Sequence, residues 1–154
     1  MKIVVDSGVD LCITPEEMSE LNIYQVPLSV TFRGKTYHEG IDISRDDFYT
    51  LLNSSYDFPS TSQPSPGLIA ETYKSFAATD PDILSVHMSS GLSGTYATAR
   101  LAAQQVPQAR VTLVDTKTLS VASGWQGLAA DRALKQGCSL EHALSLMKRI
   151  SDAT

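Results

Sequence analysis

The sequence predicts an α/β fold in which a mainly parallel sheet carries helices on both faces. Strand-like and helix-like segments alternate along the 154 residues, as they do in proteins of this class. The three clearest strands, at 2–5, 82–87 and 110–114, are continuous apolar runs rather than alternating ones, which is typical of strands covered on both faces. The length suits one domain with its own core, so residues 1–154 are expected to form one α/β unit.

The first elements are short and end in turn residues. Residues 2–5 form a buried strand that runs into the Asp-Ser-Gly turn at 6–8. Thr14 is placed to cap a helix that continues to about residue 21, with Glu17 in the position that a capping box needs.

Residues 23–32 alternate between apolar and polar side chains, and this pattern predicts a strand. Pro27 has no N–H to donate and must therefore lie at an edge or at a bulge. A turn at 33–35 lets residues 36–38 pair back as a short strand. Ser44 caps the helix that follows, whose apolar stripe consists of Phe48, Leu51 and Leu52.

The segment at 58–66, Phe-Pro-Ser-Thr-Ser-Gln-Pro-Ser-Pro, contains three prolines and four hydroxyl side chains. We expect a rigid loop without regular structure, because the prolines restrict the backbone. Ser65 then starts a helix that continues to residue 79. The later elements are a strand at 82–87, a helix to about 105, a strand at 110–114, a helix at 121–136 stopped by Gly137, and a helix from Ser139 to 150.

Three hydroxyl-rich segments, at 6–8, 89–95 and 115–120, follow the predicted parallel strands. Ligands of such folds bind outside the carboxyl ends of the strands, so these segments are the candidates for a site. The segment at 89–95 combines glycines with hydroxyls and opens a helix, which suits a phosphate or a carboxylate. It lacks the Walker, G-x-G-x-x-G and nucleophile-elbow patterns, and helix capping with tight packing is an equally consistent interpretation.

A small serine hydrolase is the alternative from another functional class. Ser93 would be its nucleophile, His87 its base and Asp115 its acid. A histidine within an apolar strand is more often a hydrogen-bonded core residue than a catalyst, which weakens this interpretation.

Composition argues against several other classes. The net charge of −5 and the absence of a basic stripe count against a nucleic-acid-binding protein. The longest apolar run is three residues, too short for a membrane span, and the first residues do not form a secretory signal, so we expect a cytoplasmic protein. Cys12 and Cys138 are predicted to be buried thiols, and the three histidines lack metal-ligand spacing.

Six segments match the motifs of a known family in the family's order. They are VDS at 5–7, VPL at 26–28, YHEGIDI at 37–43, PSTSQPS at 59–65, SSGLSGTY at 89–96 and VDTK at 114–117. On these residues the chain resembles the DegV family of bacterial fatty-acid-binding proteins. The two hydroxyl-rich motifs at 59–65 and 89–96 are highly specific together and weak alone.

The resemblance implies a lipid carrier rather than an enzyme, with one long-chain fatty acid as its ligand and no other cofactor. By this resemblance Thr61 and Ser93 hydrogen-bond the carboxylate of the fatty acid, and Ser62, Ser90 and the Gly94 N–H make secondary contacts. The resemblance also implies that the fatty acid is presented to a separate ATP-dependent fatty acid kinase. The sequence has no phosphate-binding lysine motif of its own.

The family is two-lobed, and the resemblance assigns residues 1–154 to its N-terminal lobe. The second lobe, which encloses the acyl chain and supplies an arginine and a histidine near the carboxylate, is absent from this sequence. A lone lobe is expected to expose an apolar face and to self-associate through it or to bind a lipid there. A truncated lobe without ligand is the remaining alternative.

Overall fold

The computed structural model describes the backbone of residues 1–154 and all side chains other than those of Pro15 and Ser19. The strands of its main sheet are β1 (Lys2–Asp6), β2 (Ile23–Val26), β6 (Asp82–His87) and β7 (Arg110–Asp115). They are all parallel and are ordered β2-β1-β6-β7, which confirms the predicted fold class.

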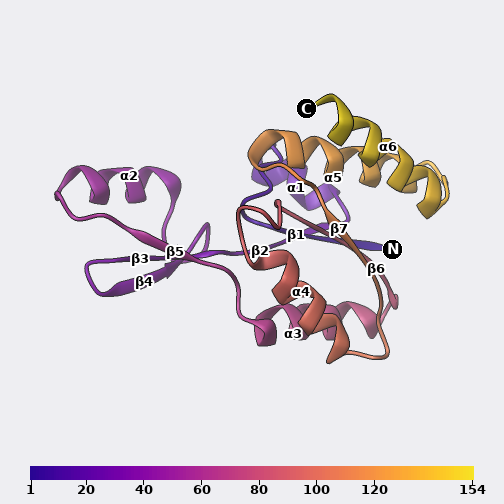
Figure 1. Ribbon diagram of the computed structural model, residues 1–154, viewed down its shortest axis with the longest axis horizontal. Helices are drawn as coiled ribbons and strands as arrows, with labels where there is room; N and C mark the ends of the chain where they lie inside the picture. Colours follow the sequence, from indigo (N-terminus) through magenta and orange to yellow (C-terminus); the bar gives the residue numbers. More distant parts are fainter.

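Helices cover both faces of this sheet (Figure 1). They are α1 (Pro15–Glu20), α3 (Pro66–Ala77), α4 (Thr95–Gln104), α5 (Ser120–Lys135) and α6 (Leu140–Ala153). Helices α5 and α6 lie on one face, where residues of α1 also pack, and α3 and α4 lie on the other.

Alternate side chains of the central strands fill two separate cores, because successive residues of a strand point to opposite faces. Ile3 and Val5 of β1 pack with α5 and α6, whereas Val4 packs with α3 and α4. Strand β6 repeats the pattern, with Leu84 in the first core and Ile83 in the second. The two central strands are therefore buried on both sides, as two of the three apolar runs predict. The prediction is wrong for the run at 110–114, because β7 is an edge strand and its residues are half-buried or exposed.

The predicted helix starts and one predicted stop are confirmed. Glu17 N–H donates to Thr14 Oγ1 at the start of α1, and Thr14 N–H donates back to the Glu17 carboxylate, which completes the capping box. Gly137 follows α5 with a φ of +82°, a conformation that suits glycine at a helix end. Serine hydroxyls cap three further helices, at Ser44, Ser65 and Ser139.

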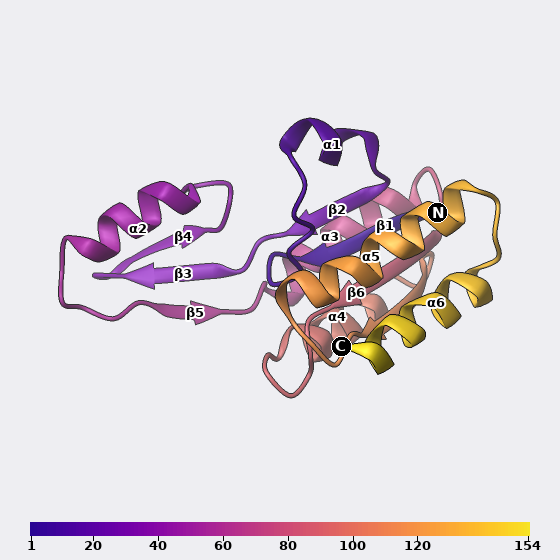
Figure 2. The ribbon, with the colours of Figure 1, turned by 90° about the horizontal axis from the view of Figure 1, so that it is seen from above.

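A second, antiparallel sheet forms an arm that projects from the parallel sheet (Figures 1 and 2). Its strands are β3 (Ser29–Phe32), β4 (Lys35–His38) and β5 (Ser60–Ser62), in the order β4-β3-β5. Helix α2 (Arg45–Asn53) lies beside them. We call residues 29–62 the arm.

Two predictions for this region are wrong. Residues 23–32 form two strands in different sheets rather than one, because Pro27 lies between β2 and β3 and cannot donate a ladder hydrogen bond. The segment at 58–66 contains regular structure, since its prolines at 59 and 64 flank β5 rather than interrupt it. Residues 60–62 can therefore pair with β3, and Thr61 lies opposite Val30.

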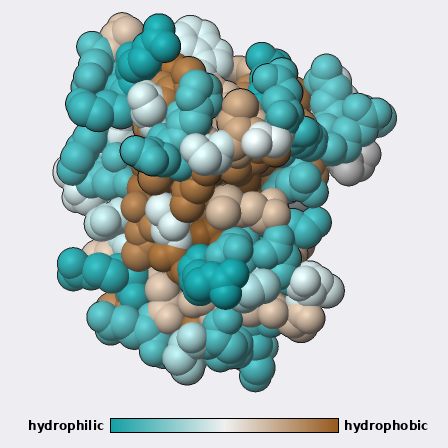
Figure 3. All heavy atoms as spheres, turned by 90° about the vertical axis from the view of Figure 1, so that its right-hand side faces the viewer, coloured by the Kyte–Doolittle hydropathy of each residue, from teal (hydrophilic) through white to brown (hydrophobic). Residues whose placement is uncertain are grey.

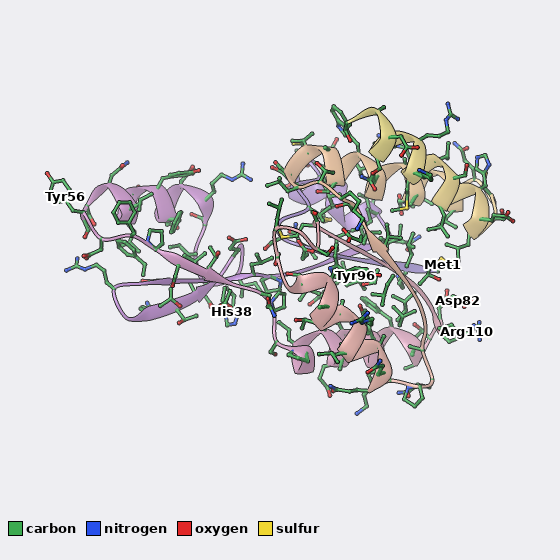
Figure 4. The ribbon with its side chains drawn as sticks, viewed as in Figure 1. Met1, His38, Tyr56, Asp82, Tyr96 and Arg110 are labelled. Carbon is green, nitrogen blue, oxygen red and sulfur yellow. The ribbon has the colours of Figure 1, made fainter. Side chains whose placement is uncertain are left out.

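The arm exposes much of its apolar surface. Phe48, Leu51 and Leu52, the predicted stripe of α2, are only half-buried. Tyr56 and Phe58 are exposed by 103% and 94%, and Tyr56 lies at the far end of the arm (Figure 4). The body has an apolar surface too: on the face away from the arm, a hydrophobic band crosses the molecule at the height of the parallel sheet (Figure 3).

The predicted burial of both cysteines is wrong. Cys12 is exposed, because it lies in the connection between β1 and α1, outside the two cores, and Cys138 is half-buried at the end of α5. Among the helices that the structure describes, none is long and apolar enough to cross a membrane.

Candidate functional site

The three hydroxyl-rich segments meet at the carboxyl edge of the parallel sheet, as predicted. Ser89 N–H donates to the Thr118 carbonyl over 2.8 Å and joins the segment after β6 to the segment after β7. Ser120 N–H donates to the Gly8 carbonyl, also over 2.8 Å, and joins the segment after β7 to the turn after β1. Backbone hydrogen bonds thus hold all three segments against one another.

An open cavity of about 530 Å³ lies where the segment after β6 faces the arm. Four of the five predicted site residues line it: Thr61 and Ser62 from β5, and Ser93 and Gly94 from the segment before α4. Residues far apart in the sequence are brought together because β5 ends beside the start of α4.

The start of α4 offers hydrogen-bond donors to this cavity. Ser93 Oγ accepts from Thr95 N–H over 3.2 Å and shares a 2.8 Å hydrogen bond with Thr95 Oγ1. Gly94 is the N-cap, and its own N–H has no partner among the described residues. The hydroxyls of Thr61 and Ser62 likewise have no partner in the described part of the chain. Unsatisfied donors at a helix N-terminus favour an anion.

Ser90, the fifth predicted residue, does not line this cavity. Its hydroxyl donates to Asp115 Oδ2 over 2.5 Å, and its N–H donates to Asp115 Oδ1 over 3.1 Å. Lys117 Nζ lies 2.7 Å from the same carboxylate. Burial raises the pKa of Asp115, but the hydrogen bonds from Lys117 and Ser90 outweigh burial and lower that pKa to about 2.

Four further residues line the cavity that the sequence did not predict as site residues, namely Leu28, Gln63, Met88 and Leu92. Gln63 is the most informative, because its Nε2 donates to Thr98 Oγ1 of α4 over 2.9 Å and so ties the end of the arm to the helix. A Cβ at Gly94 would collide with the Gln63 side-chain amide, so a larger residue there would require this side chain to shift. The motif at 59–65 contained Gln63, but only the fold shows what it contacts.

A second cavity of about 520 Å³ separates the arm from the segment between β1 and α1. Its lining is partly apolar, with Leu11, Val30 and Phe48, and partly charged. Asp10 lies there, 3.6 Å from the Arg45 guanidinium. Among the described residues, no group of three or more His, Cys, Asp or Glu side chains is arranged so that it could hold a metal ion.

Ser93, His87 and Asp115, the residues of the hydrolase alternative, do not form a catalytic triad. His87 is fully buried, as predicted for a core histidine, and its ring contacts Ser85 and Asp6 rather than Ser93. The Asp115 carboxylate is held by Ser90 and Lys117 instead. Ser93 therefore has no histidine base within hydrogen-bond reach among the described side chains.

Comparison with known proteins assigns this chain to a family. The sequence model of the family described as "Uncharacterised protein, DegV family" matches residues 1–154. The chain belongs to the DegV family. A DegV domain-containing protein of Deinococcus radiodurans is 38% identical over 148 residues, which are 96% of this chain and 52% of that protein. A DegV domain-containing 15.5 kDa protein of Staphylococcus aureus is 41% identical over 124 residues, 80% of this chain and 86% of that protein.

Solved DegV structures share the fold. A DegV family protein from Thermus thermophilus, described by its fatty acid binding, superposes with a TM-score of 0.88 at 35% identity, over 98% of this chain and 53% of that one. DegV of Bacillus subtilis, described as a fatty acid binding protein, gives a TM-score of 0.90 at 30% identity, over 98% of this chain and 53% of that one. The chain thus spans about half the length of most of the DegV proteins that it matches.

Proposed function

We propose that this DegV-family chain binds a long-chain fatty acid and holds its carboxylate in the cavity between β5 and the start of α4. The observation that carries the proposal is the convergence of unpartnered donors on one helix N-terminus: the Gly94 N–H and the hydroxyls of Thr61 and Ser62. A carboxylate is the anion that such neutral donors, without a cluster of basic side chains, are suited to bind. The DegV structures from Thermus thermophilus and Bacillus subtilis, both described by fatty acid binding, support this ligand class.

Ser93 can donate to the ligand because of how it is held. Thr95 is fully buried, and the described partner of its hydroxyl is Ser93 Oγ. When Thr95 donates both its N–H and its hydroxyl proton to Ser93 Oγ, the Ser93 hydroxyl proton remains available to the cavity. Ser93 and Thr61 are therefore proposed as the main carboxylate ligands, with Ser62 and the Gly94 N–H beside them.

Ser90 is proposed to act indirectly. Its two hydrogen bonds to Asp115 fix the start of the segment that leads to Ser93. A contact between Ser90 and the fatty acid would require breaking a short, charge-assisted bond. Ser90 thus serves as the matched control for Ser93 in the test of this proposal.

The fatty acid is proposed to be presented to a separate kinase rather than converted by this chain. The cavity is open, so a carboxylate bound there stays within reach of a second protein. By the family resemblance, the arginine and histidine that neutralise the carboxylate belong to the second lobe. Self-association of this chain through its exposed apolar surface belongs to the same proposal.

Native mass spectrometry of the protein purified from a bacterial host tests the binding. We expect a co-purifying fatty acid, and we expect the Ser93→Ala variant to bind palmitate more weakly by about 1–3 kcal/mol, since the carboxylate loses a donor. Ser90→Ala should lower the affinity less than Ser93→Ala, because Ser90 holds the segment through Asp115 without contacting the ligand. An empty protein that also fails to take up added palmitate would overturn the proposal, and turnover of a simple ester that Ser93→Ala abolishes would favour the hydrolase instead.

A further inference from the structure

A buried chain of hydrogen bonds runs along the face of the parallel sheet that packs against α3, from Tyr73 through β6 to the end of β1. Tyr73 OH lies 2.6 Å from Ser85 Oγ, and Ser85 Oγ lies 2.7 Å from His87 Nε2. The other ring nitrogen, His87 Nδ1, lies 2.9 Å from Asp6 Oδ2. All four side chains have an exposed fraction of 0%, so no substrate can reach them. The proposed fatty-acid site uses none of them directly.

One arrangement of protons gives every bond of this chain a donor and an acceptor. Burial raises the pKa of Tyr73 to about 12, although its hydrogen bond to Ser85 lowers it, so the phenol keeps its proton. The Asp6 carboxylate accepts, which requires a proton on His87 Nδ1. His87 Nε2 is then an acceptor for the Ser85 hydroxyl in a neutral ring, and Ser85 in turn accepts from Tyr73. Each of the three hydrogen bonds then contains one proton, and no buried donor lacks an acceptor.

The chain ends on a carboxylate that joins the turns after the two central strands. Besides His87 Nδ1, Asp6 Oδ2 accepts from the backbone N–H of Met88 over 3.1 Å. Asp6 Oδ1 accepts from the backbone N–H of Gly8 over 3.0 Å. Three donors thus satisfy one fully buried carboxylate, at the point where β1 and β6 both end.

These two turns are the base of the candidate site. The Met88 side chain lines the cavity of Ser93 and Gly94, and the segment that carries both residues begins at Met88. A Cβ at Gly8 would lie 2.8 Å from the Met88 sulfur and 2.9 Å from Asp6 Oδ1, so the two turns are packed without spare room. Because Asp6 Oδ2 accepts from the Met88 N–H, a change in the orientation of Asp6 would alter the position of Met88.

We propose that Asp6 and His87 are positioning residues of the carboxylate site: the neutral, Nδ1-protonated imidazole orients the buried Asp6 carboxylate, which fixes Met88 and with it the segment before α4. This inference rests on the proposed fatty-acid site for its ligand, but the hydrogen-bond geometry on which it stands is independent of that ligand.

Palmitate affinity, measured by calorimetry at a temperature where every variant is folded, is the first test. Asp6→Asn turns one acceptor into a donor that faces an N–H group, and we expect affinity to fall about tenfold, by analogy with groups that orient metal ligands, whose loss costs about 10–100-fold in metal affinity. His87→Phe should cause a similar loss because no ring N–H remains. His87→Asn keeps an N–H near the position of Nδ1 and should recover part of the affinity.

Asp131→Asn is the matched control. Asp131 is also a buried aspartate, with 2% exposure, and its Oδ1 also accepts from a backbone N–H, that of Asn22, over 3.2 Å. It lies on α5, away from the cavity, so its loss should lower thermal stability without changing palmitate affinity. Equal losses of affinity in Asp6→Asn and Asp131→Asn would show a general effect on the fold and would overturn the inference.

Nitrogen NMR of the wild-type imidazole keeps the test independent of variants and of the ligand. We expect the His87 ring to be neutral with its proton on Nδ1, and the amide signals of Met88 and Gly94 to move in His87→Phe but not in Asp131→Asn. A proton on Nε2 alone would overturn the inference even if palmitate binds well. Failure of the wild type to bind palmitate would overturn the proposed function, and the NMR result would then decide the positioning role.

Discussion

Ser7 Oγ donates a 2.6 Å hydrogen bond to Glu39 Oε2 and thereby joins the end of β1 to the arm. The same oxygen accepts from the Leu28 N–H over 2.9 Å, at the point where the chain enters the arm. The Leu28 carbonyl in turn accepts from the Glu39 N–H over 3.0 Å. These three bonds form a closed set that holds the arm beside the parallel sheet, and Leu28 lines the candidate cavity.

The first prediction concerns the hydrogen bonds that join Ser7 to Glu39 and Leu28. Ser7→Ala removes the donor to Glu39 and the acceptor for Leu28 together, and we expect it to lower the free energy of unfolding by about 1–3 kcal/mol. Hydrogen exchange at the Leu28 amide should accelerate at the same time. Glu39→Gln keeps an acceptor for Ser7 and should have a smaller effect on both measurements. Equal effects of the two substitutions would contradict the role given to Ser7.

The second prediction concerns Gly94. An alanine there would bring its Cβ against the Gln63 amide, so Gly94→Ala should turn this flexible side chain away from Thr98, loosen the link between β5 and α4 and weaken palmitate binding. Gly91→Ala is the control, because its Cβ would meet Ser89 Oγ at an ordinary 3.5 Å. Binding assays of the two variants decide the matter, and no difference between Gly91→Ala and Gly94→Ala would refute the steric argument.

Local signals in the sequence predicted what local interactions decide. The capping residues Thr14 and Ser65 and the stop at Gly137 act within a few residues, and the structure has them as predicted. The hydroxyl-rich segment before α4 was recognised for the same reason, since glycines and serines there serve one turn and one helix start. Fold class followed from the apolar runs, which report burial on both faces.

Contacts between residues far apart in the sequence could not be predicted from local patterns. β5 is a strand only because Thr61 lies opposite Val30, 31 positions earlier in the chain. The partner that fixes His87 is Asp6, 81 positions away, and the partner of Ser90 is Asp115. Ser90 and Ser93 stand three positions apart in one motif, and only the fold shows that Ser90 contacts Asp115.

The third prediction concerns the close approach of α5 to the segment after β1. A Cβ at Gly124 would overlap the backbone carbonyl group of Asp10, which cannot move aside as a flexible side chain could. Gly124→Ala should therefore cost about 1–3 kcal/mol of stability, although alanine is the better helix former. Gly127→Ala, whose Cβ would lie 3.6 Å from Leu11 Cδ2, should be neutral or stabilising. Thermal or urea unfolding of the pair measures the contrast, and a stabilised Gly124→Ala would disprove the contact.

The fourth prediction concerns self-association. Tyr56 and Phe58 at the end of the arm are almost fully exposed, and Ile41 and Tyr49 are exposed by 70% and 56%. Exposed apolar side chains clustered on one projection favour association. We expect sedimentation velocity to show a concentration-dependent shift to a larger species, which the double substitution Tyr56→Ser and Phe58→Ser should reduce. A monomer at high protein concentration would count against it.

The fifth prediction is a pH dependence set by Asp115. The pKa of its carboxyl is lowered from 3.8 to about 2, because hydrogen bonds from Lys117 and Ser90 outweigh the opposing effect of burial. A carboxylate with a lower pKa in the folded chain stabilises the fold above pH 3.8, and this contribution is lost as the pH falls toward 2. The stability difference between wild type and Asp115→Asn should therefore shrink between these two pH values.

Ser90→Ala removes one of the hydrogen bonds that lower the pKa, so an NMR titration of Asp115 in that variant should show a higher pKa than in wild type. An unchanged titration would mean that Ser90 does not hold Asp115 in solution, and Ser90 would then be available to the ligand after all.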